Sequence, residues 1–290
     1  MENLAQFIGA YAVLLLAGTW FATLLTLLLV WTWARRHGRT LQHHYYRAAD
    51  WLHRSSPMRA LHARAPALER VSLRTAMVWI PLLAFTVIVI ALNAFGELAD
   101  GIGPNEELHR FDNALAAALL EHSTPAVHRF FGAVTHLGDW LTLAAIGIAV
   151  ALALLVRRRG ILLYGWILAL AGSGLLNVSI KAWFARARPG EIPLLDTWSF
   201  PSGHAMNSLV AYGMLVYLLS RVVPHRWMGI AIAVAVTIVM MVGASRMFLH
   251  LHYFSDVLAG FAAGLAWLAV CIAMTEVGLR RAGKRARPNA

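Results

Sequence analysis

Three groups of residues in the second half of the chain carry side chains suited to phosphate chemistry. They are Lys181 with Arg188-Pro189, then Pro201-Ser202-Gly203-His204, and then Ser245-Arg246 with His252 and Asp256. Lysine and arginine bind anions that have several oxygens, and imidazoles supply nucleophiles and proton donors. The combination of three cations, two imidazoles and a carboxylate predicts a site that binds a phosphate group and reacts with it.

The third group contains a candidate nucleophile. His252 and Asp256 are four residues apart, a spacing that places two side chains on one face of a helix. The carboxylate can then hold one imidazole nitrogen and leave the other free to attack. His204 is the second imidazole and can donate a proton to the departing oxygen. His250 is the local rival, but its spacing of six residues turns it away from Asp256 on a helix.

The composition indicates a membrane protein. Of the 290 residues, 59% are hydrophobic and 13% are charged, whereas a soluble domain carries about 25% charged residues. The net charge of +11 would suit a nucleic-acid-binding protein, but such basic chains are poorer in apolar residues. We therefore expect a lipid bilayer and no nucleic acid as partner. The single Cys271 excludes an intramolecular disulfide framework.

Seven stretches are long and apolar enough to cross about 30 Å of hydrocarbon, which takes roughly 20 helical residues. They lie at about residues 7–33, 76–95, 131–156, 161–184, 203–220, 228–247 and 253–275. The predicted fold is all-α, a polytopic transmembrane helix bundle. We divide it into an N-terminal span with a basic connection (1–74), a six-span core (75–277) and a basic tail (278–290). A cleaved signal peptide is not expected, because Glu2 is acidic and the first apolar stretch is too long.

Lysine and arginine fall unevenly on the two sides of these spans. Nineteen of the 25 lie in residues 35–74, 157–159, 221–226 and 280–287, and six lie in the other connections. Because short basic loops stay in the cytoplasm, we expect the C-terminus there and the N-terminus outside, in the inner (plasma) membrane of a bacterial-type cell. Residues 35–74 would also suit an amphipathic helix on an anionic leaflet, although the charge bias alone explains them.

Under this topology the three groups share the outer membrane face. Lys181, Arg188 and Arg246 are costly at a membrane boundary unless an anion neutralises them, and a phosphate is a fitting partner. Ser202 stands where a helix begins, so the amides of Ser202, Gly203 and His204 can point at that anion.

In their order and spacing, the three groups resemble the three-part signature of the type 2 phosphatidic acid phosphatase superfamily, over about residues 75–277. The resemblance implies a metal-independent phosphatase with no cofactor. It implies that His252 is the nucleophile of a phosphohistidine mechanism, that Asp256 orients it, and that His204 is the general acid. The resemblance also assigns phosphate binding to a set of five residues: Lys181, Arg188, Arg246, Ser202 and Gly203. Ser245 also matches the signature, but the resemblance implies no defined role for it.

Each of these residues also has an ordinary interpretation. Lys181 and Arg188 alone could be interfacial side chains that reach toward water, and His204 alone could cap a helix. We favour the catalytic interpretation because three such groups are not expected to share one membrane face by accident.

Four other features have more than one interpretation. His136 and Asp139 could line the pocket, but we favour polar capping at the interface. Gly260 and Gly264 suit close helix packing inside the bundle at least as well as dimerisation. The histidines of residues 37–44 are irregularly spaced and favour a basic surface over a metal site. The outer connection, 97–128, is expected to contain a short surface helix. It could cover an outward-facing site, but we favour a solvated connector.

The predicted activity is hydrolysis of a lipid phosphate or diphosphate at the outer leaflet. By resemblance, the candidate substrates are undecaprenyl diphosphate, which we rank first, phosphatidylglycerol phosphate, phosphatidic acid and the phosphates of lipid A. A phosphotransferase that passes the phosphate to another lipid stays open. A non-catalytic lipid-phosphate carrier is disfavoured, because it would need neither the two histidines nor Asp256. The first span and its basic connection could set substrate access or bind a protein partner that the sequence does not identify. Head-group specificity would depend on loops such as residues 191–196.

Overall fold

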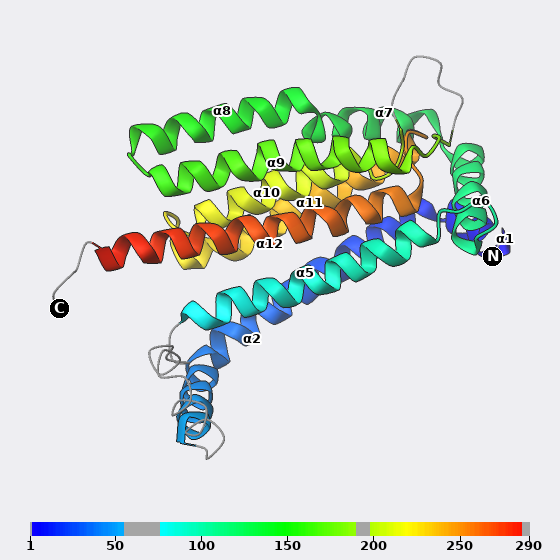
Figure 1. Ribbon diagram of the computed structural model, residues 1–290. Helices are drawn as coiled ribbons and strands as arrows, with labels where there is room; N and C mark the ends of the chain where they lie inside the picture. The colour runs from blue at the N-terminus through cyan, green and yellow to red at the C-terminus, as the bar shows by residue number, and fades with distance from the viewer. Residues whose placement is uncertain (1, 55–75, 190–197, 286–290) are drawn as a thin grey trace.

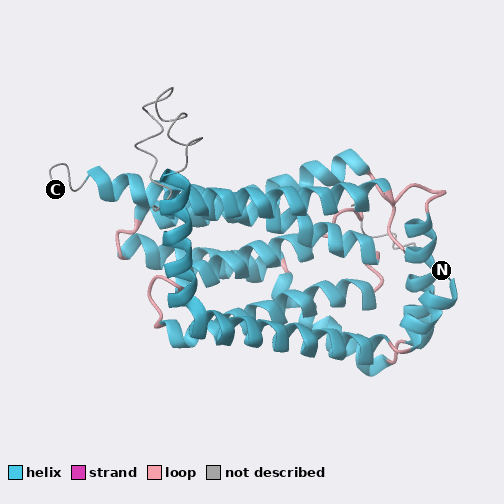
Figure 2. Cartoon of the chain, turned by 90° about the horizontal axis from the view of Figure 1, so that it is seen from below, coloured by secondary structure: helices cyan, strands magenta, loops and turns pink. Residues whose placement is uncertain are grey.

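The structure, a computed structural model, describes residues 2–54, 76–189 and 198–285. Its elements are α1 (Glu2–Ala10), α2 (Ala12–Arg54), α5 (Ala76–Asp100), α6 (Glu107–His122), α7 (Pro125–Val134), the 3-10 helix η1 (Thr135–Gly138), α8 (Trp140–Val156), α9 (Gly160–Phe184), α10 (Gly203–Leu219), α11 (His225–Phe248) and α12 (Phe254–Arg285). Figure 2 shows only helices and loops in this described part of the chain. The all-α prediction is confirmed.

All seven predicted spans are helical. Six apolar segments are long enough to cross a membrane: Ala12–Trp33, Pro81–Asp100, Pro125–Val156, Gly160–Phe184, His225–Phe248 and Phe254–Gly283. The remaining predicted span is α10, whose 17 residues stand at the lower limit of about 17 to 25 for a crossing helix. The protein is therefore an integral membrane protein.

The third predicted span, 131–156, is not one continuous helix. The chain leaves α7 at Val134, makes the 3-10 turn of η1, and begins α8 at Trp140. A turn of this kind breaks the α-helical hydrogen-bond pattern and often marks a functional position. As a result Thr135, His136 and Asp139 lie at a break in the span rather than within a regular helix.

The core of the bundle lies between α9, α10 and α12. Trp166 of α9, Met214 of α10 and Cys271 of α12 are fully buried in one apolar cluster. Trp166 also donates from Nε1 to the carbonyl oxygen of Gly147 on α8 at 2.9 Å. Because lipid is as apolar as the helices, close packing and such hydrogen bonds hold a membrane bundle together.

Gly260 and Gly264 let α12 approach α10 within the same chain. A Cβ atom at Gly260 would lie 2.6 Å from the carbonyl oxygen of Ser202, and one at Gly264 would lie 2.9 Å from that of Met206. The glycines thus serve packing inside the bundle, and they bring the beginnings of α10 and α12 together.

The two N-terminal helices pack against α11 and α6, at the periphery of the bundle. Trp20 of α2 donates from Nε1 to Thr237 Oγ1 of α11 at 2.9 Å, and α1 packs along α6. The interpretation of the 97–128 connection as a solvated connector is wrong, because α6 has an apolar partner in α1 and buries Phe111 and Leu115.

The polar ends of the helices gather at one end of the bundle. Figure 1 shows the end of α9, the beginning of α10, and the turn from α11 to α12 at the same end as α6 and α7. The three sequence groups lie at these helix ends, so they share one end of the bundle, as the prediction of a common site requires. The basic connection between the first two spans is helical as far as Arg54. Residues 55–75 lie outside the described residues, and so does the loop at 191–196.

Candidate active site

His252 and Asp256 form a close pair at the turn between α11 and α12. His252 Nδ1 lies 3.4 Å from Asp256 Oδ2. The predicted geometry was wrong in one respect, because His252 precedes the helix and only Asp256 lies in its first turn. The backbone instead folds back, with His252 N donating to the carbonyl oxygen of Arg246 at 3.1 Å. Asp256 Oδ2 also accepts from Tyr253 N at 2.9 Å, so the carboxylate is fixed at a helix N-terminus.

The imidazole of His252 is neutral at physiological pH. The side chain is buried, and this burial lowers the pKa of His252 to about 3, although the hydrogen bond and charge of Asp256 act in the opposite direction. The nearby charges of Lys181 and Arg246 lower the pKa further. With Nδ1 protonated and facing Asp256, Nε2 keeps its lone pair for attack on an electrophile.

Arg188 lies beside the free nitrogen of this imidazole. Its Nη1 is 3.4 Å from His252 Nε2 and donates to the carbonyl oxygen of Leu251 at 2.6 Å. The side chain is partly buried, which lowers its pKa, but a guanidinium remains charged in proteins. The cation is thus placed where the oxygens of a group attached to Nε2 would lie.

Lys181 and Arg246 complete a group of three cations. Lys181 Nζ donates to the carbonyl oxygens of Trp198 and Ser199, the second at 3.2 Å. Arg246 is buried and donates from Nη1 to Thr135 Oγ1 at 2.7 Å. Arg188 and Arg246 are both within electrostatic range of Lys181. Like charges held this close favour a multiply charged anion between them.

The Pro201-Ser202-Gly203-His204 segment begins α10 as predicted, but its amides are not all free. Ser202 is buried, its Oγ accepts from Ala205 N at 3.4 Å, and its own N–H donates to the carbonyl oxygen of Asp256 at 2.9 Å. The expectation that the Ser202 amide binds an anion is therefore wrong, because the packing of α12 on α10 engages it. A Cβ atom at Gly203 would lie 2.8 Å from Asn177 Oδ1, so a larger residue at this position would displace the side chain of Asn177.

The hydroxyl of Ser245 makes no hydrogen bond to the other site residues in the described part of the chain. It is buried, and its Oγ donates to the carbonyl oxygen of Val242 at 2.6 Å within α11.

His204 has a carboxylate partner that the sequence did not favour. Its Nε2 lies 2.7 Å from Asp139 Oδ1, while Asp139 Oδ2 lies 2.6 Å from His136 Nδ1. The capping interpretation of Asp139 is wrong, because its side chain makes no capping hydrogen bond to α8. The break at η1 points the carboxylate toward α10 instead. A carboxylate in this position favours the protonated imidazole, whereas burial and the charge of Arg246 favour the neutral form. A phosphate bound between the cations would offset the charge of Arg246 and so favour the protonated form that a general acid requires.

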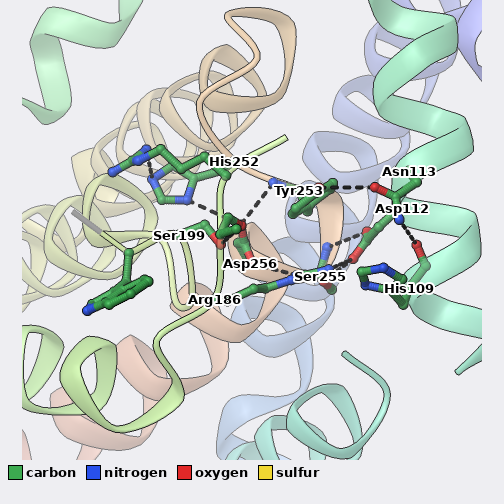
Figure 3. Close-up of polar contacts among 12 residues, drawn as sticks. His109, Asp112, Asn113, Arg186, Ser199, His252, Tyr253, Ser255 and Asp256 are labelled. Atoms are coloured by element: carbon green, nitrogen blue, oxygen red, sulfur yellow. Dashed lines mark hydrogen bonds and ion pairs between the residues drawn. The ribbon is translucent and has the colours of Figure 1, made fainter. Parts of the chain in front are cut away.

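Arg186 also contacts the site, although the sequence did not predict a role for it. Its Nη1 donates to Asp256 Oδ1 at 2.7 Å and to Ser255 Oγ at 2.8 Å, and its Nη2 donates to Asp112 Oδ2 at 2.8 Å. Figure 3 shows Arg186 between Asp256 on α12 and Asp112 on α6. The available signal was a third cation between Lys181 and Arg188 on an otherwise acidic face.

The Arg186 contacts connect α6 to the beginning of α12. Asp112 Oδ1 accepts from Ser255 N at 3.1 Å, and Tyr253 Oη donates to Asn113 Oδ1 at 3.0 Å. The Arg186 guanidinium lies 4.2 Å from the centre of the Tyr253 ring. Burial raises the pKa of Asp112, and its contacts with Ser255 and Arg186 oppose this shift. The helix α6, in the connection that follows α5, thus holds the turn that carries His252.

Together, the helical bundle and these side chains define a class of membrane protein with a cation-rich site in which two imidazoles each face a carboxylate. Residues 160–278 match the model of the PAP2 superfamily. Phosphatidylglycerophosphatase B of Bacillus subtilis (strain 168) is 32% identical over an alignment of 163 residues that covers 53% of this chain and 78% of the relative. The chain belongs to the PAP2 superfamily and is a membrane phosphatase of that family.

A solved structure agrees with this assignment. The crystal structure of a transmembrane PAP2 type phosphatidylglycerolphosphate phosphatase from Bacillus subtilis superposes with a TM-score of 0.59 and 28% sequence identity. The superposition covers 66% of this chain and 96% of that chain.

Proposed function

We propose that the protein hydrolyses a lipid phosphate at the outer membrane leaflet through a phosphohistidine intermediate at His252. The observation that carries this proposal is the placement of His252, whose Nδ1 faces Asp256 while its Nε2 lies 3.4 Å from Arg188. One nitrogen is thus held by a carboxylate, and the other is directed toward the cations.

In the first half-reaction, Nε2 of His252 attacks the phosphorus atom. A bond forms between nitrogen and phosphorus, and the bond between phosphorus and the lipid oxygen breaks. Binding of the anionic phosphate group favours protonation of His204, which is paired with Asp139 and gives its proton to the departing lipid oxygen. Lys181, Arg188 and Arg246 neutralise the equatorial phosphate oxygens, whose charge is spread in the transition state.

In the second half-reaction, water releases the phosphate. The now neutral His204 accepts a proton from water as the water oxygen bonds to phosphorus, and the bond to His252 breaks. Inorganic phosphate leaves, and both imidazoles return to their starting protonation states. Asp256 stabilises the positive charge that His252 carries during both steps.

Phosphatidylglycerol phosphate is the first substrate to test, because the curated relative and the solved structure both carry that activity in their names. This changes the order suggested by the sequence alone, in which undecaprenyl diphosphate came first. The outer-leaflet orientation rests on the charge distribution, since the catalytic groups lie at the end of the bundle away from the basic connections.

Phosphate release from the purified protein in detergent and EDTA tests the proposal. We expect release from phosphatidylglycerol phosphate to exceed that from phosphatidic acid, undecaprenyl diphosphate or lipid A, and to continue in EDTA because Lys and Arg supply the positive charge. His252→Gln should lower the rate about 10⁴-fold or more. The matched control is His250→Asn, which suits the positive φ of 55° at that position and should stay active.

Full activity of His252→Gln would overturn the nucleophile assignment. Loss of activity in EDTA, restored by a divalent cation, would overturn metal independence. Transfer of labelled phosphate to an added acceptor lipid, with none released to water, would replace hydrolysis by phosphotransfer.

A further inference from the structure

A cavity of about 740 Å³ lies between α8, α9, α10 and α12, at the end of the bundle opposite the catalytic residues. Its volume falls within the roughly 300 to 1,000 Å³ of pockets that hold small ligands. The wall is mainly aliphatic, with Leu154 of α8, Leu162 of α9, Leu219 of α10 and Leu279 of α12 among its residues. The charged lining residues are Arg157, Arg159 and Arg221.

The apolar and charged parts of this cavity are separated along the bundle. The α8 residues that line it run from Val150 to Arg157, a distance of about 10 Å at the rise of an α-helix. One leaflet of hydrocarbon is about 15 Å deep. The aliphatic wall therefore lies at the depth of acyl chains, and the arginines lie at the depth of lipid head groups.

The three arginines differ in whether an acidic side chain pairs with them. Arg221 is paired with Glu276 and donates to Tyr217 Oη at 3.0 Å. Arg157 and Arg159 are exposed, and neither has an acidic partner among the described residues. Arg158, between them in sequence, does not line the cavity and has a positive φ of 53°. Two unneutralised cations thus stand at the mouth of an apolar cavity.

We propose that this cavity binds an anionic membrane phospholipid at the membrane surface opposite the active site. One acyl chain lies against the leucines, and the head-group phosphate contacts Arg157 and Arg159. Basic pockets between transmembrane helices bind anionic head groups in this way. Because Leu154, Leu162 and Leu279 also pack against the central apolar cluster, the bound lipid stabilises the contact of the α8–α9 hairpin with α10 and α12. The site is separate from the one that binds substrate.

Native mass spectrometry of the delipidated full-length protein tests this site. Phosphatidylserine and phosphatidylcholine with identical acyl chains serve as probes, and we expect the wild type to prefer phosphatidylserine. At about 1 kcal/mol for each basic residue near the surface, the double variant Arg157→Gln/Arg159→Gln should bind phosphatidylserine about 30-fold more weakly. The control Arg158→Gln should bind it as the wild type does.

Two results would overturn the proposal. Equal binding of both lipids by the wild type would mean that the cavity holds ordinary bilayer lipid only. Unchanged phosphatidylserine binding by the double variant would place the lipid elsewhere, including at the active site. Thermal unfolding of each variant without lipid verifies that it is folded, and added phosphatidylserine should raise the melting temperature of the wild type more than that of the double variant.

Discussion

Arg186 donates a hydrogen bond from Nη1 to Asp256 Oδ1 at 2.7 Å, while the other carboxylate oxygen of Asp256 faces His252. The carboxylate that orients the proposed nucleophile is thus held from two sides. The same guanidinium reaches Asp112 on α6, so a helix that carries none of the three sequence groups contributes to the position of His252.

Substitution of Arg186 should separate positioning from phosphate binding. In Arg186→Lys an ammonium replaces the planar fork that contacts two carboxylates, and Lys cannot reproduce this geometry. By analogy with outer partners that orient active-site ligands, we expect kcat to fall about 10-fold to 100-fold with KM nearly unchanged. Steady-state kinetics on the proposed lipid substrate measures both constants.

Asp112→Asn supplies the matched comparison, because the amide retains one oxygen for Ser255 N but removes the charge that faces Arg186. We expect Asp112→Asn to lower kcat less than Arg186→Lys does. If Arg186→Lys lowers only the melting temperature and leaves kcat intact, Arg186 has a structural role and does not position Asp256.

Removal of the carboxylate that faces His204 should impair protonation of the leaving group. Asp139→Asn eliminates the negative charge 2.7 Å from His204 Nε2, so the imidazolium is less favoured. We expect kcat to fall about 10²-fold to 10⁴-fold, the usual contribution of general acid catalysis. The basic limb of the pH–rate profile should move to lower pH. His136→Gln, which alters the other side of the same carboxylate, should have a smaller effect. Equal losses in both variants would contradict the assignment.

The burial of His252 predicts how stability depends on pH. Its pKa in the folded protein is about 3, below the ordinary value of 6.5, so the folded state favours the neutral imidazole. The resulting stabilisation is complete above pH 6.5 and is lost as the pH falls toward 3, since the unfolded chain then binds the proton first. Thermal unfolding between pH 7 and pH 4 should therefore show a weaker dependence on pH in His252→Gln than in the wild type. NMR titration that places the pKa of His252 near 6.5 would refute this expectation.

Gly260 offers a test of the contact between α10 and α12. The Cβ atom of Gly260→Ala would lie 2.6 Å from the carbonyl oxygen of Ser202, and backbone cannot move away as a side chain can. We expect a loss of about 1 to 3 kcal/mol in the free energy of unfolding and a lower kcat, because Ser202 N is bonded to Asp256 O. Gly174→Ala is the control, since its Cβ would meet nothing within 4 Å and alanine favours a helix by about 0.5 to 1 kcal/mol. Equal melting temperatures in the two variants would contradict this account of the packing.

The sequence by itself determined the helical class, the approximate limits of the spans and the gathering of three motifs at one membrane face. These features are local. Spans follow from the length of apolar stretches, because every backbone polar group in lipid must be satisfied within its own helix. The pairing of His252 with Asp256 also depends on a short spacing of four residues.

Only the tertiary structure decided which polar groups support the proposed catalytic residues. Arg186 and Asp112 are 74 residues apart, and Asp139 and His204 are 65 residues apart. No periodicity links positions this distant, so Asp139 resembled an interfacial cap and α6 resembled a solvated connector. Their roles depend on the break at η1 and on the packing of α1 against α6, because a buried charge is stable only where the fold brings a partner of opposite charge to it.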